Sequence, residues 1–195
     1  MANQANNVNK QASNPMKVIT GPDTRWSYAN VWEAKSINGG TPKFSVSLII
    51  PKSDTKTVAR IKAAIEAAYR EGEAKLKGNG KSIPPLSTIK TPLRDGDTER
   101  PDDPAYANAY FINANSATAP GVVDADRQEI LNRSEVYSGV YGRASVNFYA
   151  FNSNGNKGIA CGLNNLQKIH DGEPLGGKSR AEDDFATYDE EDFLG

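Results

Sequence analysis

Residues 137–151 read YSGVYGRASVNFYAF, the clearest β-strand pattern in the chain. Alternate positions are small or apolar from Val140 onward, and the positions between them are aromatic or polar, with Arg143 at their centre. This period of two predicts a long strand with one buried face and one outward face. Gly139 and Gly142 would let the strand bend sharply, as the strands of small barrels do.

Further strands are expected on both sides of this one. Residues 152–156 (NSNGN) predict a hairpin loop, after which the chain returns as a partner strand over residues 158–166. Upstream, apolar and β-branched runs bounded by Gly and Pro predict strands at residues 16–20, 25–32, 43–50 and 106–113.

One long segment has a helical period instead. Val58, Ile61 and Ile65 recur at helical spacing, Ser53 is a candidate N-cap, and glycines follow at positions 78 and 80. We therefore expect one major inserted helix over about residues 54–76. Five or six strands with no repeating βαβ pattern favour a mainly β fold, an antiparallel barrel for which the OB-fold is the leading candidate.

The charges are divided along the chain. The whole chain has a net charge of −1, but residues 181–195 contain seven acidic residues and no basic one. Residues 1–180 hold 23 basic and 17 acidic residues, a net charge of +6. A basic body joined to an acidic end is typical of nucleic-acid binding or of an interaction tail, and a segment that only improves solubility is the alternative.

Three parts follow from this division. Residues 1–15 are expected to be a flexible arm, residues 16–175 a folded domain and residues 176–195 a disordered acidic tail. No stretch has the length and apolar character of a membrane span, and the N-terminus lacks the apolar core of a secretory signal. Together with the single cysteine, these features predict an intracellular, cytoplasmic protein.

The reactive side chains argue against catalysis. His170 is the only histidine and Cys161 the only cysteine, whereas a structural zinc needs four such ligands. Residues 172–179 (GEPLGGKS) satisfy the P-loop pattern, but an acidic run follows where a P-loop needs a helix, so we interpret the match as a glycine-rich linker. The acidic residues between positions 95 and 103 are interpreted as solvated loop charges, with a weak divalent-ion site as the alternative. We expect no enzymatic activity, no metal and no cofactor.

The side chains that bind single-stranded nucleic acids are present. Such proteins combine aromatic rings that stack on bases with cations that contact phosphates. The candidate stacking residues are Tyr137, Tyr141, Tyr149, Trp26, Tyr28 and Trp32, and the candidate phosphate contacts are Arg143, Lys43, Lys90, Arg94, Lys157 and Arg25. The tyrosines of residues 137–151 could instead cover a barrel face beneath a loop or form a homodimer contact, and the tryptophans could anchor the core.

Three segments near the C-terminus carry a family resemblance. YSGVYGRASVNFYAFN (residues 137–152), NKGIACGLNNLQK (156–168) and DGEPL (171–175) resemble the signature of a phage single-stranded DNA-binding protein family that was long catalogued as a domain of unknown function. The resemblance extends over about residues 16–175. It implies an OB-fold with an inserted helix, little sequence preference, and a role in phage DNA replication or recombination inside the host cytoplasm.

The acidic tail agrees with this resemblance. Single-strand-binding proteins of bacteria and phages often end in an acidic peptide with a terminal aromatic residue. The corresponding residues here are Asp189, Glu190, Glu191, Asp192 and Phe193, followed by two more residues. We expect this tail to compete with DNA for the basic body and to bind replication proteins. A phage structural or assembly module and an RNA-binding or strand-annealing protein are the alternative functions.

Overall fold

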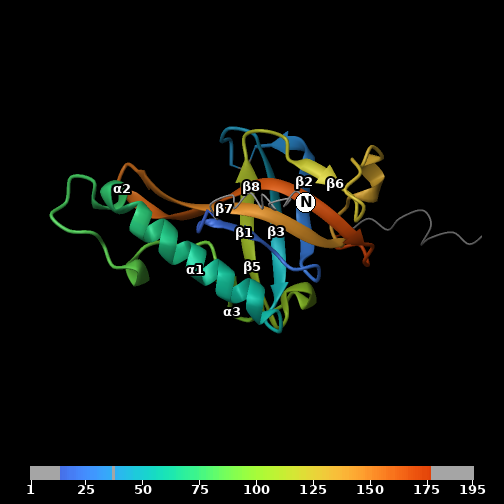
Figure 1. Cartoon of the computed structure of the whole chain (residues 1–195), viewed down its shortest axis with the longest axis horizontal. Coiled ribbons are helices and arrows are strands. Elements are labelled where there is room, and N and C mark those ends of the chain that lie inside the picture. Colours follow the sequence, from blue (N-terminus) through green and yellow to red (C-terminus); the bar gives the residue numbers. More distant parts are fainter. Residues whose placement is uncertain (1–13, 37, 177–195) are drawn as a thin grey trace, which may run out of the picture.

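The computed structural model describes residues 14–36 and 38–176, which form a mainly β domain (Figure 1). Its strands are β1 (Lys17–Ile19), β2 (Arg25–Lys35), β3 (Lys43–Pro51), β4 (Arg94–Asp95), β5 (Ala109–Ser116), β6 (Gly121–Val123), β7 (Tyr141–Ser153) and β8 (Asn156–His170). Its helices are α1 (Thr55–Glu71), α2 (Glu73–Lys77) and α3 (Gly96–Glu99), with 3₁₀ turns at Leu86–Thr88, Pro104–Tyr106 and Arg133–Glu135. The acidic tail, including the candidate partner-binding residues 189–193, lies outside the described residues.

Five of these strands close into a barrel. β2 pairs with β3, β3 with β5 and β7 with β8, all antiparallel, whereas β5 pairs with β8 in parallel. The pairing of Arg25 with Tyr141 joins β7 back to β2 and closes the ring. This small closed barrel with its inserted helices confirms the predicted OB-like fold. The described strands number eight rather than five or six, because β4 and β6 add short edges to β5 and β8.

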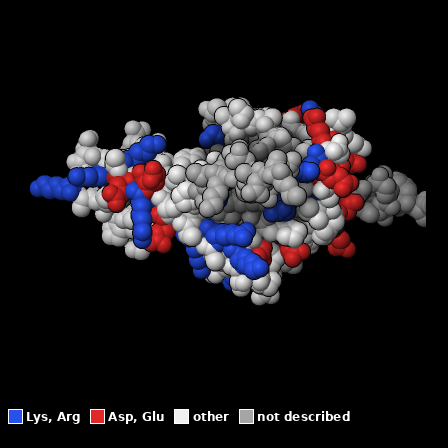
Figure 2. Space-filling model, viewed as in Figure 1, with Lys and Arg blue, Asp and Glu red and all other residues white. Residues whose placement is uncertain are grey.

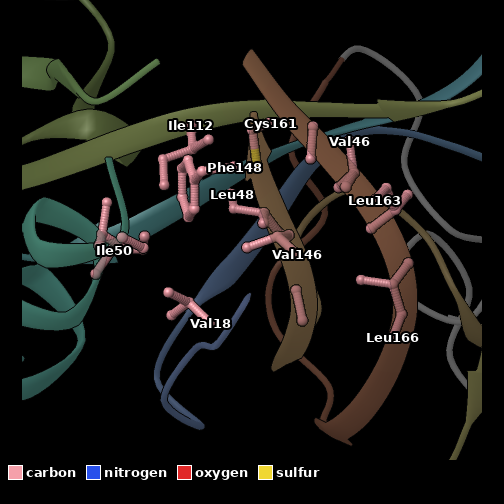
Figure 3. Packing of buried hydrophobic residues seen from close by; sticks show 14 of the residues in the cluster. Val18, Val46, Leu48, Ile50, Ile112, Val146, Phe148, Cys161, Leu163 and Leu166 are labelled. Carbon is pink, nitrogen blue, oxygen red and sulfur yellow. The ribbon is translucent and has the colours of Figure 1, made fainter. Parts of the chain in front are cut away.

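The barrel interior holds the apolar positions that the period of two predicts. On β7, Val146 and Phe148 are buried, whereas Arg143, on the opposite face of the strand, is exposed. Figure 3 shows side chains from several strands meeting inside the barrel, with Leu48 beside Phe148, and Leu163 belongs to the same cluster. Burying one side chain of this size stabilises the fold by about 1.5–3 kcal/mol. The closed core therefore fixes which face of each strand points outward.

The helices α1 and α2 pack against β7, and α1 also contacts β1 and β8 (Figure 1). Val58, Ile61 and Ile65 form part of the buried face of α1, as the helical period predicts. The single helix expected over residues 54–76 is divided at Gly72. Here the helix lies so close to β7 that a Cβ atom on Gly72 would be 2.2 Å from the Cβ atom of Ala150.

Several expected boundaries differ from the structure. The strands expected over residues 137–151 and 158–166 run over Tyr141–Ser153 and Asn156–His170, and the strand expected over residues 25–32 extends to Lys35. The N-cap of α1 is Asp54 and not Ser53, because the Asp54 carboxylate accepts a hydrogen bond from the backbone N–H of Thr57 at 3.2 Å. The strand expected over residues 106–113 begins at Ala109, because Pro104–Tyr106 forms a 3₁₀ turn in front of it.

Candidate nucleic-acid interface

The outer face of β2, β3 and β5 is polar. Ser45 of β3 pairs with Asn115 of β5, and Ser47 pairs with Asn113. Asn30 of β2 lies opposite Ser45, and its side-chain amide donates a hydrogen bond to the Ser45 hydroxyl at 3.3 Å. Residues opposite one another in a ladder point to the same side of the sheet, so these five side chains form one polar floor.

The polar floor lies in an open cleft of about 690 Å³. Lys35 and Lys43 pair with each other at one end of the β2–β3 ladder, and both line the cleft. Tyr28 and Arg100 line it as well. None of the described residues that line the cleft is acidic. A cleft with three cations and no described carboxylate suits an anionic ligand.

Tyr28 is the exposed ring of this cleft. The residue is 58% exposed. Its backbone has φ 47°, in the left-handed region that costs a non-glycine residue about 1–2 kcal/mol. The Arg100 guanidinium lies 5.5 Å from the ring centroid and donates a hydrogen bond to the Tyr28 hydroxyl at 3.4 Å. This hydrogen bond raises the pKa of Arg100, whose guanidinium is always charged in proteins.

A second small apolar cluster supports the cleft from one side. It is formed by Ile49, Tyr106, Ala109 and Phe111. The Tyr106 hydroxyl shares a hydrogen bond with the Ser47 hydroxyl at 3.1 Å, and the Arg100 guanidinium lies 5.1 Å from the Tyr106 ring centroid. Arg100 is therefore held between two rings at the wall of the cleft.

Strand β8 continues the outer face beyond β5. Gly162 pairs with Asn115 at the edge of the polar floor. Tyr149 on β7 is 45% exposed, and its ring would lie 3.5 Å from a Cβ atom on Gly162. Because Gly162 has no side chain, the Tyr149 ring borders the backbone directly beside the floor.

Of the six expected stacking residues, Tyr28 and Tyr149 thus present exposed rings on or beside this face. Trp26 is fully buried, and its indole N–H donates a hydrogen bond to the Gly142 carbonyl at 3.1 Å, so neither ring face is available to a base. Trp32 is half-buried against the core, and its indole N–H donates to the Arg133 carbonyl at 3.1 Å. Both tryptophans have the anchoring role that was the alternative interpretation.

Tyr137 and Tyr141 do not share one open groove with Tyr149. Gly139 has φ +125°, a conformation that favours glycine, and β7 begins only after it. The Tyr141 ring stacks on His170 with a centroid distance of 4.6 Å. The Tyr137 hydroxyl donates a hydrogen bond to the Gly172 carbonyl at 2.9 Å. These two tyrosines fasten the segment that follows β8.

The expected phosphate contacts are also divided between locations. Lys43 lines the cleft. Lys90, in the loop after α2, lies beside Lys157 of the β7–β8 hairpin, where the Lys90 N–H donates to the Lys157 carbonyl at 3.4 Å. Lys90 is exposed and Lys157 is half-buried. These three lysines remain candidates for phosphate contacts.

The three candidate arginines have partners within the protein. The Arg25 guanidinium donates to the carbonyl of Glu173 at 2.6 Å and packs over Tyr141. Arg94 forms an ion pair with Glu99 at 2.9 Å. Arg143 lines a separate cavity of about 710 Å³ beside the N-terminus of α1. None of the three lines the cleft, and the Arg143 Nε–H donates a hydrogen bond to the Thr20 carbonyl at 3.3 Å.

The described residues contain no group of three or more His, Cys, Asp and Glu side chains that could hold a metal ion. Lys52 contacts Asp95 at 3.0 Å and Asp97 at 2.8 Å, and it lowers the pKa of Asp97. Burial raises the pKa of Cys161, which points into the core. No helix among the described residues is long and apolar enough to cross a membrane.

Several cleft residues were missed from the sequence. The alternation over residues 43–50 places Ser45 and Ser47 on one face, but it does not show that this face is open to solvent. Asn113 and Asn115 belong to β5, which ends at Ser116, three residues beyond the end expected from the sequence. Arg100 reaches the cleft from a loop with no period, so only tertiary structure places it there. Lys35 carried a signal, since it flanks the predicted second strand.

Comparisons with known proteins identify the family and the fold of this chain. Residues 16–194 match the family described as Enterobacter phage Enc34, ssDNA-binding protein. Putative protein p50 of Acyrthosiphon pisum secondary endosymbiont phage 1 is 30% identical over 184 residues, which cover 88% of this chain and 96% of the relative.

Solved structures show the same fold. The C-terminal truncation of the single-stranded DNA-binding protein from bacteriophage Enc34 is similar with a TM-score of 0.68 and 23% identity, over 83% of this chain and 90% of that chain. The same phage protein in complex with ssDNA gives a TM-score of 0.66 and 25% identity, over 84% and 91% of the two chains. Since the family match covers nearly the whole sequence, this chain belongs to the family of the Enterobacter phage Enc34 ssDNA-binding protein.

Proposed function

We propose that this chain binds single-stranded DNA across the cleft of β2, β3 and β5, with little sequence preference. The observation that carries the proposal is the lining of that cleft: an exposed ring, three cations, a polar floor and no acidic side chain among the described lining residues. The relative from bacteriophage Enc34, whose fold this chain shares, has been solved in complex with ssDNA, which supports the assignment.

Each part of the lining has a role in such binding. Tyr28 offers a ring on which one base can stack, a contact that contributes about 1–3 kcal/mol per base. Lys35, Lys43 and Arg100 supply positive charge for phosphates. The hydroxyl and amide groups of the floor both donate and accept hydrogen bonds, so they can pair with the edge of any base. This versatility accounts for low sequence preference.

The acidic tail would compete with DNA for this cleft. Leu175, close to the end of the described chain, packs against the apolar cluster that contains Tyr106, and Tyr106 bonds to the floor residue Ser47. The first acidic residue of the tail, Glu182, follows Leu175 by seven residues, which span up to about 25 Å. The seven carboxylates are therefore tethered within reach of the cations in the cleft, at a high effective concentration.

The competition can be tested by comparing the full chain with three variants: one without the tail, one with a neutral tail and one with a scrambled tail. Deleting residues 181–195 should raise affinity for an oligothymidylate by about tenfold at low salt, and by less at high salt, because salt weakens the tail contact. Replacing the seven acidic residues by Asn and Gln should have the same effect, whereas a scrambled tail of unchanged composition should not. Equal affinity for all forms at low salt would contradict tail competition.

When DNA occupies the cleft, the displaced tail would become available to other proteins. Its acidic residues and Phe193 offer a charged and aromatic peptide of the kind that replication or recombination partners recognise. We accordingly assign the chain to phage DNA replication or recombination. Binding of such a partner to the protein–DNA complex, but not to the same complex with a neutral tail, would support this role.

The proposed ligand can be tested directly by fluorescence anisotropy. A labelled oligothymidylate, an RNA and a duplex of the same length should be titrated with the full chain at two salt concentrations. We expect the DNA single strand to bind more tightly than the duplex, because bases stacked within a duplex cannot reach Tyr28. Absence of binding to all three would point instead to a protein-contact role.

A further inference from the structure

The positive charge of the folded body is concentrated in one segment. Residues 52–94, which form α1, α2 and the loop after them, contain ten basic and four acidic residues, a net charge of +6. The remainder of residues 1–180 contains 13 basic and 13 acidic residues, so this segment carries the whole excess. Figure 2 shows Lys and Arg side chains projecting from the end of the molecule where α2 lies, with acidic side chains among them, and further acidic side chains at the opposite end.

Five lysines lie on α2, on the loop that follows it and on β8 next to the turn of the β7–β8 hairpin, and they are here called the lysine tip. They are Lys75, Lys77, Lys81, Lys90 and Lys157. The Asn152 side-chain amide donates to the Lys75 carbonyl at 3.0 Å, which fastens α2 to the hairpin. The Ile159 N–H donates to the Lys90 carbonyl at 2.8 Å, which fastens the loop to β8. Among the described residues, none of the five lysines forms an ion pair within the protein.

Lys157 of the lysine tip lies on β8, the strand that borders the cleft. Gly162, which pairs with the floor residue Asn115, is four residues from Gly158, and Gly158 forms a bridge with Lys90. Four residues of strand span about 13 Å, the reach of two or three nucleotides of an extended single strand. The exposed Tyr149 ring borders Gly162 at the start of this path.

We propose that the lysine tip is a second contact region for single-stranded DNA, which takes the phosphates of the nucleotides that follow those in the cleft. The proposal rests on the proposed function, because it extends the same bound strand. Tyr149 provides a stacking ring between the two regions, and the unpaired lysines supply cations where the strand leaves the barrel. The bound strand then covers both the barrel face and the hairpin.

The position of the tip favours DNA over the acidic tail as its ligand. β8 runs from the tip at Asn156 to His170, a length of about 46 Å, and the described chain ends beyond His170 (Figure 1). Glu182 reaches only about 25 Å from Leu175, so only the last residues of the tail of the same chain could touch the tip.

The test uses the full chain and two lengths of oligothymidylate, one of about 6 nucleotides that fills the cleft and one of about 16 that also reaches the tip. The tip variant carries Lys75→Gln, Lys77→Gln and Lys81→Gln, all exposed positions. A control variant with the same change of charge carries Lys56→Gln, Arg60→Gln and Lys62→Gln, on the first half of α1. Circular dichroism confirms that both variants keep the fold.

The tip variant should lose affinity for the long oligonucleotide only. Each lost phosphate contact lowers the slope of log affinity against log salt by about 0.7, so three contacts lower it by about 2. Over a fourfold rise in salt, the deficit of the tip variant should therefore shrink by roughly tenfold or more, and the control variant should show no deficit specific to the long strand. The inference would be overturned if the tip variant lost affinity equally for both lengths or lost none. A gain in affinity would also overturn it, because that result is expected if the tip binds the acidic tail. Failure of the unchanged chain to bind the short oligonucleotide would instead overturn the proposed function.

Discussion

Replacing Tyr28 by glycine should separate DNA binding from stability. The ring is 58% exposed beside Arg100, and the backbone has φ 47°. Glycine adopts this conformation freely, so the substitution relieves about 1–2 kcal/mol of strain. It also adds about 0.5–1 kcal/mol of chain entropy to be lost on folding and removes the contact between ring and guanidinium, about 0.5–1 kcal/mol. The free energy of unfolding should therefore change by no more than about 1 kcal/mol.

The same substitution should weaken ssDNA binding clearly. Loss of one stacked base costs about 1–3 kcal/mol, which corresponds to a fall in affinity of about 5- to 150-fold. Anisotropy titrations with a labelled oligothymidylate give the affinity, and urea denaturation of the same samples gives the stability. Tyr28→Phe is the matched control, because it keeps the ring and removes only the hydroxyl that accepts from Arg100 at 3.4 Å. Affinity of Tyr28→Gly within about twofold of the unchanged chain would refute the role of this ring.

Three further predictions concern the scaffold. Gly142→Ala should destabilise the fold by about 1–3 kcal/mol in urea denaturation, because its Cβ atom would lie 2.2 Å from the Gln167 carbonyl oxygen and 2.6 Å from the Trp26 ring, and an unchanged midpoint would contradict this packing. Asp97→Asn should destabilise the protein at neutral pH, because Lys52 lowers the pKa of Asp97. A lowered pKa in the folded state gives stability that is present above the ordinary aspartate pKa and is lost as the pH falls through the pKa of the folded state. The difference in unfolding free energy between the two proteins should therefore vanish in acid. Cys161 should resist iodoacetamide in the native protein and react after unfolding, since burial raises its pKa, and labelling at equal rates in both states would show that the thiol is accessible.

The core could be predicted from the sequence because its signal is periodic. The alternation along residues 137–151 assigns Val146 and Phe148 to the interior, and the helical spacing of Val58 and Ile61 assigns the buried face of α1. Both patterns depend only on neighbouring residues of one element. Tertiary contacts decided the boundaries instead, as at Gly72, where close packing on β7 divides the helix.

The candidate site was harder to predict, because strand parity shows which residues share a face and not which face is open. Trp26 and Tyr28 were grouped by parity, yet the positive φ of Tyr28 changes the direction of its side chain, and one ring is buried while the other is exposed. Tyr141 lies on the outward face as expected but is covered by His170, a partner 29 residues away in sequence. Arg100 enters the cleft from a loop, where no period exists to predict it.

The central claim, that ssDNA occupies the cleft of β2, β3 and β5, can be tested most directly by NMR. Amide spectra of the ¹⁵N-labelled chain should be recorded during titration with an oligothymidylate of about 6 nucleotides. The side-chain amides of Asn113 and Asn115 belong to the floor of the cleft and report on its occupancy. We predict that these signals and the backbone amide of Tyr28 shift with a common dissociation constant. Shifts confined to the outward face of β7 around Tyr141 and Arg143, with the two asparagine side chains unchanged, would contradict the claim.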